Sequence, residues 1–135
     1  MKISATVRNA PTHHEAVVST AGKEQPLAVP AKLMGSGSAV NGGEFLMLAL
    51  ATCYCNDLYR EAARMGLPIE SLEVEASAVF EGIGLAASDI CYRAKVVSTA
   101  SDEEIAELLR VTDAVAEVHN TIRAGVSVTL DLSQK

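Results

Sequence analysis

The stretch from Asn41 to Gly66, NGGEFLMLALATCYCNDLYREAARMG, decides the fold because it predicts one long helix. Asn41 is a suitable cap for its start, and Glu44, three residues on, can return a hydrogen bond to the backbone of the cap. Gly66 followed by Pro68 is typical of the end of a helix. We therefore interpret the rest of the chain as elements that cover and serve this helix.

The first half of this helix, from Phe45 to Cys55, is apolar at almost every position, so we expect it to be buried on all sides. The second half regains a wet face, formed by Asn56, Arg60, Glu61 and Arg64. The apolar half reaches only about 16 Å, roughly half of a bilayer core, so no membrane span is predicted. A chain this small supplies too little cover for a helix that is apolar all round. The pattern therefore indicates a second subunit, and we expect a homodimer.

The composition is that of one globular domain covering residues 1–135. Hydrophobic residues make up 49% and charged residues 21%, and the net charge is -6 without clustered Lys or Arg. This balance argues against nucleic acid or an anionic membrane as a partner and favours small molecules or protein. The first residues, MKISATVRNAP, contain no apolar run typical of a signal peptide, so a cytoplasmic protein is expected. Three cysteines, an odd number, fit a reducing compartment.

Alternating and helical apolar patterns predict the remaining elements. Strands are expected at residues 2–8, 15–20 and 26–29 before the helix, and at 71–80 and 90–98, as a hairpin, after it. Ser101 with Glu104 forms a capping box for a second, amphipathic helix that runs to about His119. Alternation over residues 126–132 predicts a final strand. The expected fold class is α+β, with the order β-β-β-α-β-β-α-β and no internal repeat.

Cys53 is the sharpest candidate for chemistry, because a thiol in the middle of an apolar helix is a nucleophile held away from bulk water. Its position is equally typical of a cysteine that packs as a small hydrophobe. Burial raises the pKa of a thiol, and Cys53 lies too far from the helix start to gain from the dipole, so a reactive thiolate needs a nearby cation. Cys55 points about 200° away on the helix, which excludes a disulfide between the two. The usual zinc-ligand spacings are absent, so no metal is predicted.

Three other residues have an ordinary structural interpretation beside a functional one. Glu44 is explained as the capping partner of Asn41, and it lies about 13 Å before Cys53 along the helix axis, so the two meet only across an antiparallel partner helix. His119 near the end of the second helix is interpreted as a donor to the last carbonyls. Arg8 lies on the polar face of the first strand, where most side chains are solvated.

Two segments resemble the OsmC and organic-hydroperoxide-resistance family. The segment GGEFLMLALATC, from Gly42 to Cys53, resembles the motif P-x-E-L-L-L-A-A-L-A-x-C of that family. The segment VHNTIR, from Val118 to Arg123, resembles its second motif, C-P-V-H-N-T-L. The resemblance implies an intertwined homodimer with two central helices packed back to back between sheets, and active sites at the subunit interface.

The resemblance also implies a reaction. Family members reduce organic or inorganic hydroperoxides without a bound cofactor: the first-motif cysteine, here Cys53, attacks as a thiolate, becomes a sulfenic acid and is resolved by the second-motif cysteine. Here Ala116 takes the place of the resolving cysteine and Glu117 that of the following proline. Glu44 fits the catalytic glutamate of some branches, whereas the hydroperoxide-resistance branch would place it at Gly43. Arg8 is the available substitute for the catalytic arginine of that branch.

Three hypotheses follow. In the first, Cys53 is the peroxidatic cysteine of a thiol-dependent hydroperoxide reductase, an oxidoreductase of oxidative stress, and an external thiol reduces it. In the second, the protein is a catalytically inactive member that binds a small apolar ligand in the dimer-interface groove. The third pairs Cys53 with Cys55 or Cys91 after local rearrangement, which helix geometry disfavours.

Overall fold

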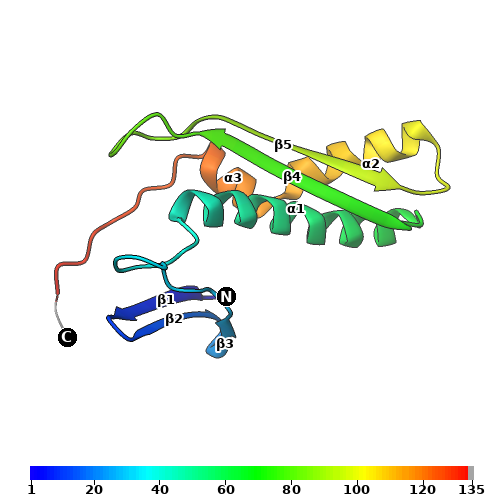
Figure 1. The fold of residues 1–135 in the computed structure, drawn as a ribbon. Helices are drawn as coiled ribbons and strands as arrows, with labels where there is room; N and C mark the ends of the chain where they lie inside the picture. The colour runs from blue at the N-terminus through cyan, green and yellow to red at the C-terminus, as the bar shows by residue number, and fades with distance from the viewer. Residues whose placement is uncertain (134–135) are drawn as a thin grey trace. The chain divides into compact units, whose positions relative to one another are not determined.

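The computed structural model describes residues 1–133 (Figure 1). They form two compact units, of which the first is Met1–Phe45 and the second begins at Leu46. The division falls in the first turn of the long helix α1, Gly42–Met65. The architecture is mixed α+β, as predicted. Among the described residues, no helix has both the length and the apolar character needed to cross a membrane.

The first unit contains an antiparallel sheet of three strands in chain order, β1 (Ile3–Ala10), β2 (His13–Thr20) and β3 (Lys23–Leu27). Ala21 and Gly22, with φ values of 50° and 84°, form the two-residue turn that pairs Thr20 with Lys23. This turn fixes the start of β3, so the prediction of a strand over residues 26–29 was three residues late.

The sheet of the first unit carries little cover. The alternation of apolar and polar residues over positions 2–8 predicts a half-buried strand, but every residue of β1 is exposed. Ile3 and Val7, on its apolar face, are 66% and 61% exposed. Only Ala16 of β2 is buried. A strand face of apolar side chains that the chain leaves open is a face available to another subunit.

Helix α1 begins and ends as its sequence predicts. The Asn41 side chain accepts a hydrogen bond from the Glu44 amide at 2.9 Å, and the Asn41 amide donates to the Glu44 carboxylate at 2.7 Å. At the other end Gly66 adopts a φ of 69°, and the Leu67 amide donates to the Ala62 carbonyl at 2.9 Å. These contacts are a capping box and a left-handed C-terminal cap, which satisfy helix-end groups that lack helical partners.

Within the single chain the first half of α1 is not covered on all sides. In the first half Leu48 is 57% exposed. The buried positions lie on one stripe and mostly further along: Leu50, Tyr54, Asp57, Leu58, Glu61 and Ala62. Glu61 therefore belongs to the buried stripe and not to the wet face predicted for it. The first half is covered only in part because the second unit packs mainly on the later turns.

The second unit has a hairpin of β4 (Ser71–Val79) and β5 (Ser88–Val97) lying across α1 and α2 (Asp102–Val115) (Figure 1). Its core contains Tyr54, Leu58, Ala62, Leu108 and Ala116. The Tyr54 hydroxyl donates to the Leu109 carbonyl at 2.7 Å, which ties α1 to α2. The predicted hairpin and the capping box of Ser101 with Glu104 are confirmed.

The second helix does not continue to His119. It ends at Val115, Ala116 is extended with φ -72° and ψ 100°, and a short helix α3 follows at Glu117–Arg123. The Asn120 side chain donates to the Ala114 carbonyl at 3.1 Å, which satisfies one carbonyl left open by the break. Ala116 is fully buried. The break turns the chain and brings the start of α3 to α1.

The predicted final strand is absent from the described residues. Residues 126–132 have no strand assignment, and the apolar side chains of the alternation are largely exposed: Val126 at 61%, Val128 at 98%, Leu130 at 80% and Leu132 at 81%. A strand needs a partner edge for its backbone N–H and C=O groups, and within the described chain this segment pairs with none. The prediction was wrong for the single chain because alternation specifies a face, not a partner.

Candidate active site

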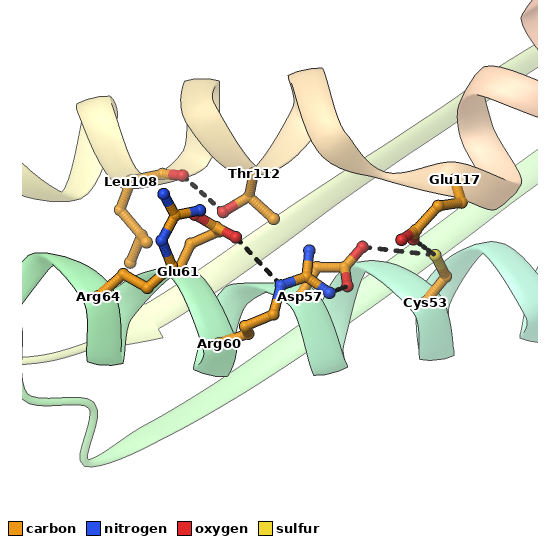
Figure 2. Close-up of polar contacts among 8 residues, drawn as sticks. All are labelled: Cys53, Asp57, Arg60, Glu61, Arg64, Leu108, Thr112 and Glu117. Carbon is orange, nitrogen blue, oxygen red and sulfur yellow. Dashed lines mark hydrogen bonds and ion pairs between the residues drawn. The ribbon is translucent and has the colours of Figure 1, made fainter.

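Cys53 faces two carboxylates (Figure 2). Its sulfur donates to Asp57 Oδ2 at 3.5 Å and lies 3.9 Å from Glu117 Oε2. Asp57 follows Cys53 by four positions, which places both on one side of α1. Glu117 reaches the sulfur because the break at Ala116 starts α3 there. Residues from both motifs noted in the sequence therefore meet at one sulfur.

The surroundings of Cys53 favour the thiol over the thiolate. Burial is the largest effect that raises the pKa of Cys53, and the charges of Asp57 and Glu117 raise it further. A hydrogen bond from the Val118 amide opposes these effects in part. Within residues 46–133 no Arg, Lys or His side chain hydrogen-bonds to the sulfur. In this unit Cys53 is therefore a protonated thiol at neutral pH.

A row of ion pairs continues from Asp57 along α1 (Figure 2). Arg60 Nη1 lies 2.6 Å from Asp57 Oδ1, and Arg60 Nε lies 3.1 Å from Glu61 Oε1. Arg64 Nη1 contacts Glu61 Oε2 at 2.9 Å. The hydrogen bond from Arg60 is the main cause that lowers the pKa of Glu61. Arg60 thus stabilises the buried carboxylates of its own helix instead of the sulfur.

One cluster in the described residues has the ligand types of a metal site. The ligand atoms of Cys53, Asp57 and Glu117 all lie within 4.8 Å of one another. One thiol and two carboxylates suit a divalent ion such as zinc. Arg60 already pairs with Asp57, however, and its fixed charge opposes a second cation. We assign no metal to the cluster.

His119 lies buried beside a small cavity. Its ring centroid is 4.3 Å from that of Tyr92, and only 3% of the residue is exposed. Neither ring nitrogen has a hydrogen-bond partner among the described residues, which corrects the interpretation that His119 serves the last helix carbonyls. Burial, followed by the charge of Arg123, lowers the pKa of His119 and keeps the ring neutral. The cavity has a volume of about 120 Å³ and is lined by Leu50, Ile90, Tyr92, His119, Ile122 and Arg123.

The other two predicted site residues, Arg8 and Glu44, lie in the first unit. Arg8 on β1 pairs with Glu15 on β2 at 2.6 Å, and its side chain is 61% exposed. Glu44 forms the cap of α1. Cys53 belongs to the second unit, so the cluster around the sulfur is built without either residue.

Asp57 and Glu117 are the site residues that sequence reasoning missed. The spacing of four from Cys53 was a usable signal for Asp57. Glu117 gave no such signal, because a continuous second helix was expected and its position on that helix would not approach Cys53.

Comparisons with known proteins identify the relatives of the chain. Residues 35–131 match the family described as OsmC-like protein. Three solved structures show the same fold over most of both chains. The OsmC-like protein from Mycoplasma pneumoniae has a TM-score of 0.62 at 19% identity, covering 90% of this chain and 86% of the other.

The second structure is an organic hydroperoxide resistance protein from Elizabethkingia anophelis, with a TM-score of 0.62 at 16% identity and coverages of 91% and 89%. The third, described as an organic hydroperoxide resistance protein OsmC from Legionella pneumophila, has a TM-score of 0.60 at 16% identity and coverages of 91% and 90%. No curated protein matches the chain.

Proposed function

The chain belongs to the OsmC-like protein family, and on that premise we propose that it reduces hydroperoxides with Cys53 as the peroxidatic thiol and an external thiol as the reductant. The observation that carries the proposal is the meeting of the two family motifs in space. Cys53 of the first motif lies 3.9 Å from Glu117, which takes the place of the proline in the second motif. Several relatives of the same fold are described as organic hydroperoxide resistance proteins.

The proposed cycle needs no bound cofactor. The sulfur of Cys53 attacks one peroxide oxygen, which yields a sulfenic acid and an alcohol, or water when the peroxide is hydrogen peroxide. Ala116 stands where the family has its resolving cysteine, and all three cysteines are free in the structure. Two equivalents of an external thiol therefore return the sulfenic acid to the thiol, with release of water and a disulfide. A reducing compartment such as the cytoplasm supplies such thiols.

The homodimer forms part of the proposal. Apolar side chains that one chain leaves exposed occur on β1, on the first half of α1 and along residues 126–132. A second copy that covers these surfaces would satisfy each of them in a symmetric arrangement. Arg8 and Glu44 would then act on Cys53 from the subunit interface, and Arg8 would supply the cation that the second unit lacks.

A second candidate function is the binding of a small, mainly apolar ligand without catalysis. It is favoured by the cavity beside His119, whose two ring nitrogens have no partner among the described residues. The cavity is half open to solvent and, with a volume of about 120 Å³, has room for a small ligand. The missing resolving cysteine also fits this alternative.

The test is consumption of cumene hydroperoxide with dithiothreitol or dihydrolipoamide, comparing wild type with Cys53→Ser. We expect the variant to lose the enzyme-dependent rate, whereas the exposed control Cys91→Ser retains it. Intact mass after one equivalent of peroxide should show the gain of one oxygen on wild type and not on Cys53→Ser. Equal slow rates in wild type and Cys53→Ser would favour the ligand-binding alternative.

A further inference from the structure

The two carboxylates at Cys53 differ in burial and in partners (Figure 2). Asp57 is 4% exposed, and its Oδ1 accepts a hydrogen bond from Arg60 at 2.6 Å. Glu117 is exposed, and among the described residues its carboxylate has the sulfur of Cys53 as its hydrogen-bonding neighbour. Asp57 is therefore buried and hydrogen-bonded to a guanidinium, whereas Glu117 is accessible to solvent.

Attack on a peroxide requires the thiolate, because the thiol is a poor nucleophile. The groups that face Cys53 within its unit are Asp57 from α1, with Arg60 behind it, and Glu117 from α3. Neither carboxylate stabilises a thiolate, and burial disfavours it further. The Val118 amide opposes these effects only in part. The thiol proton has to leave before or during the attack of the sulfur, and a base within reach of the sulfur would accept it.

Glu117 fits this role better than Asp57. Asp57 is held by its ion pair with Arg60, and its burial keeps water from carrying a proton away from it. Glu117 Oε2 lies 3.9 Å from the sulfur, at the outer limit of a hydrogen bond to sulfur, and solvent reaches it. Glu117 also follows Ala116 directly, and Ala116 takes the place of the family's resolving cysteine.

We propose that Glu117 is a catalytic general base that takes the proton of the Cys53 thiol during attack and delivers it to the leaving oxygen of the peroxide. This inference depends on the proposed hydroperoxide reduction. The S–O bond forms to the terminal oxygen of the peroxide, which carries the hydrogen, and the O–O bond breaks so that the alkyl-bound oxygen leaves as an alkoxide. The sulfur loses two electrons and the peroxide gains them. The proton from Glu117 converts the leaving alkoxide to an alcohol, so a thiol and a hydroperoxide give a sulfenic acid and an alcohol.

The proposal predicts opposite effects of Glu117→Gln on two reactions of the same sulfur. Alkylation by iodoacetamide uses the thiolate and needs no proton delivered to a leaving oxygen. The charge of Glu117 raises the pKa of Cys53, so its removal should lower that pKa and speed alkylation at neutral pH. Oxidation by cumene hydroperoxide should instead slow by about 100-fold, within the usual range for loss of a general base.

Both rates are measured on the Cys53 peptide by mass spectrometry, with dimedone trapping the sulfenic acid. The full chain is used, and circular dichroism checks the fold of each variant. Glu103→Gln, which removes an exposed carboxylate from α2, is the matched control and should leave both rates unchanged. Glu117→Asp retains the base and should recover part of the peroxide rate. At a pH above the pKa of the thiol, the difference in peroxide rate between wild type and Glu117→Gln should disappear, because the thiol is then already deprotonated.

The outcomes distinguish the inference from the function on which it depends. If Glu117→Gln reacts with peroxide as fast as wild type, or gains rate in proportion to alkylation, Glu117 is not the base, while hydroperoxide reduction stands. If wild type and Cys53→Ser consume peroxide equally, both the reduction and the role of Glu117 are overturned. Slower oxidation together with faster alkylation supports the general base, because a purely structural effect would slow both reactions.

Discussion

The two halves of α1 differ in which side chains are exposed and which are buried. In the first half apolar side chains remain open, with Leu48 at 57% exposure. In the second half, charged Asp57 and Glu61 are 4% and 5% exposed and lie on the same stripe as fully buried Leu58. Burial along this helix therefore follows what packs on each turn and not the polarity of the residue. Within the described chain the second half has a buried stripe, whereas the first half leaves apolar side chains exposed.

Asp57 and Glu61 can be buried in the second half of α1 because both carboxylates form ion pairs. Arg60 contacts both Asp57 and Glu61, and Arg64 adds a second contact to Glu61. Both arginine side chains remain partly exposed to solvent. The buried carboxylates are therefore neutralised by guanidinium groups whose own desolvation costs little free energy. Cys53, one turn before Asp57, lies where the apolar half meets this charged half.

The largest change in stability is expected for Leu58→Ala in the second half of α1. Leu58 is fully buried in the core, so the substitution should lower the free energy of unfolding by about 2–5 kcal/mol through lost burial and a cavity. Urea denaturation at several protein concentrations measures this. The matched substitution Leu33→Ala, at a fully exposed loop residue, should change it by less than about 0.5 kcal/mol. Equal losses would contradict the comparison.

A smaller, pH-dependent effect is expected for Arg60→Ala. Arg60 lowers the pKa of Glu61 in the folded state, so its stabilisation is present above the unfolded pKa and disappears as pH falls through the folded pKa. Stability of wild type should therefore drop in acid more steeply than that of Arg60→Ala, below a pH of about 4.

Thermal unfolding across this acid range measures the slope. Arg93→Ala, which removes an exposed pair with Glu75 on the hairpin, is the control and should keep the wild-type slope. An unchanged slope in Arg60→Ala would show that the pairing with Glu61 does not stabilise the second half.

The smallest change in the secondary structure of the single chain is expected for Leu48→Glu in the first half of α1. A charge at this exposed position needs no rearrangement within the chain, so the far-ultraviolet circular dichroism spectrum should stay unchanged. The variant should instead weaken self-association, seen as a lower mass in light scattering at equal concentration. Loss of secondary structure in dilute solution would mean that the first half is also completed within one chain.

The sequence predicts those features that depend on near neighbours. The cap of α1 was predictable because Asn41 and Glu44 bond to each other's backbone within one turn. The hairpin β4–β5 was predictable from its alternation. The break at Ala116 was not, because nothing in the helical spacing marks it and it depends on Asn120 reaching back to the Ala114 carbonyl.

Of the residues that form the candidate site, only Cys53 could be predicted from the sequence. Cys53 follows from the motif and its place on the helix. Its carboxylate neighbours do not, because the contact with Glu117 requires the break before α3 and Asp57 is buried only in the folded unit. The roles of Arg8 and Glu44 depend on a second subunit and remain predictions.

The exposed segment 126–132 has a consequence for the life of a newly made chain. Its backbone groups and its alternating apolar side chains are those of a strand without a sheet. Until another edge pairs with it, such a segment can recruit the wrong strand and seed aggregation. If the proposed second copy supplies that edge, overproduction faster than two copies associate should send the protein to inclusion bodies, and slower synthesis should recover it.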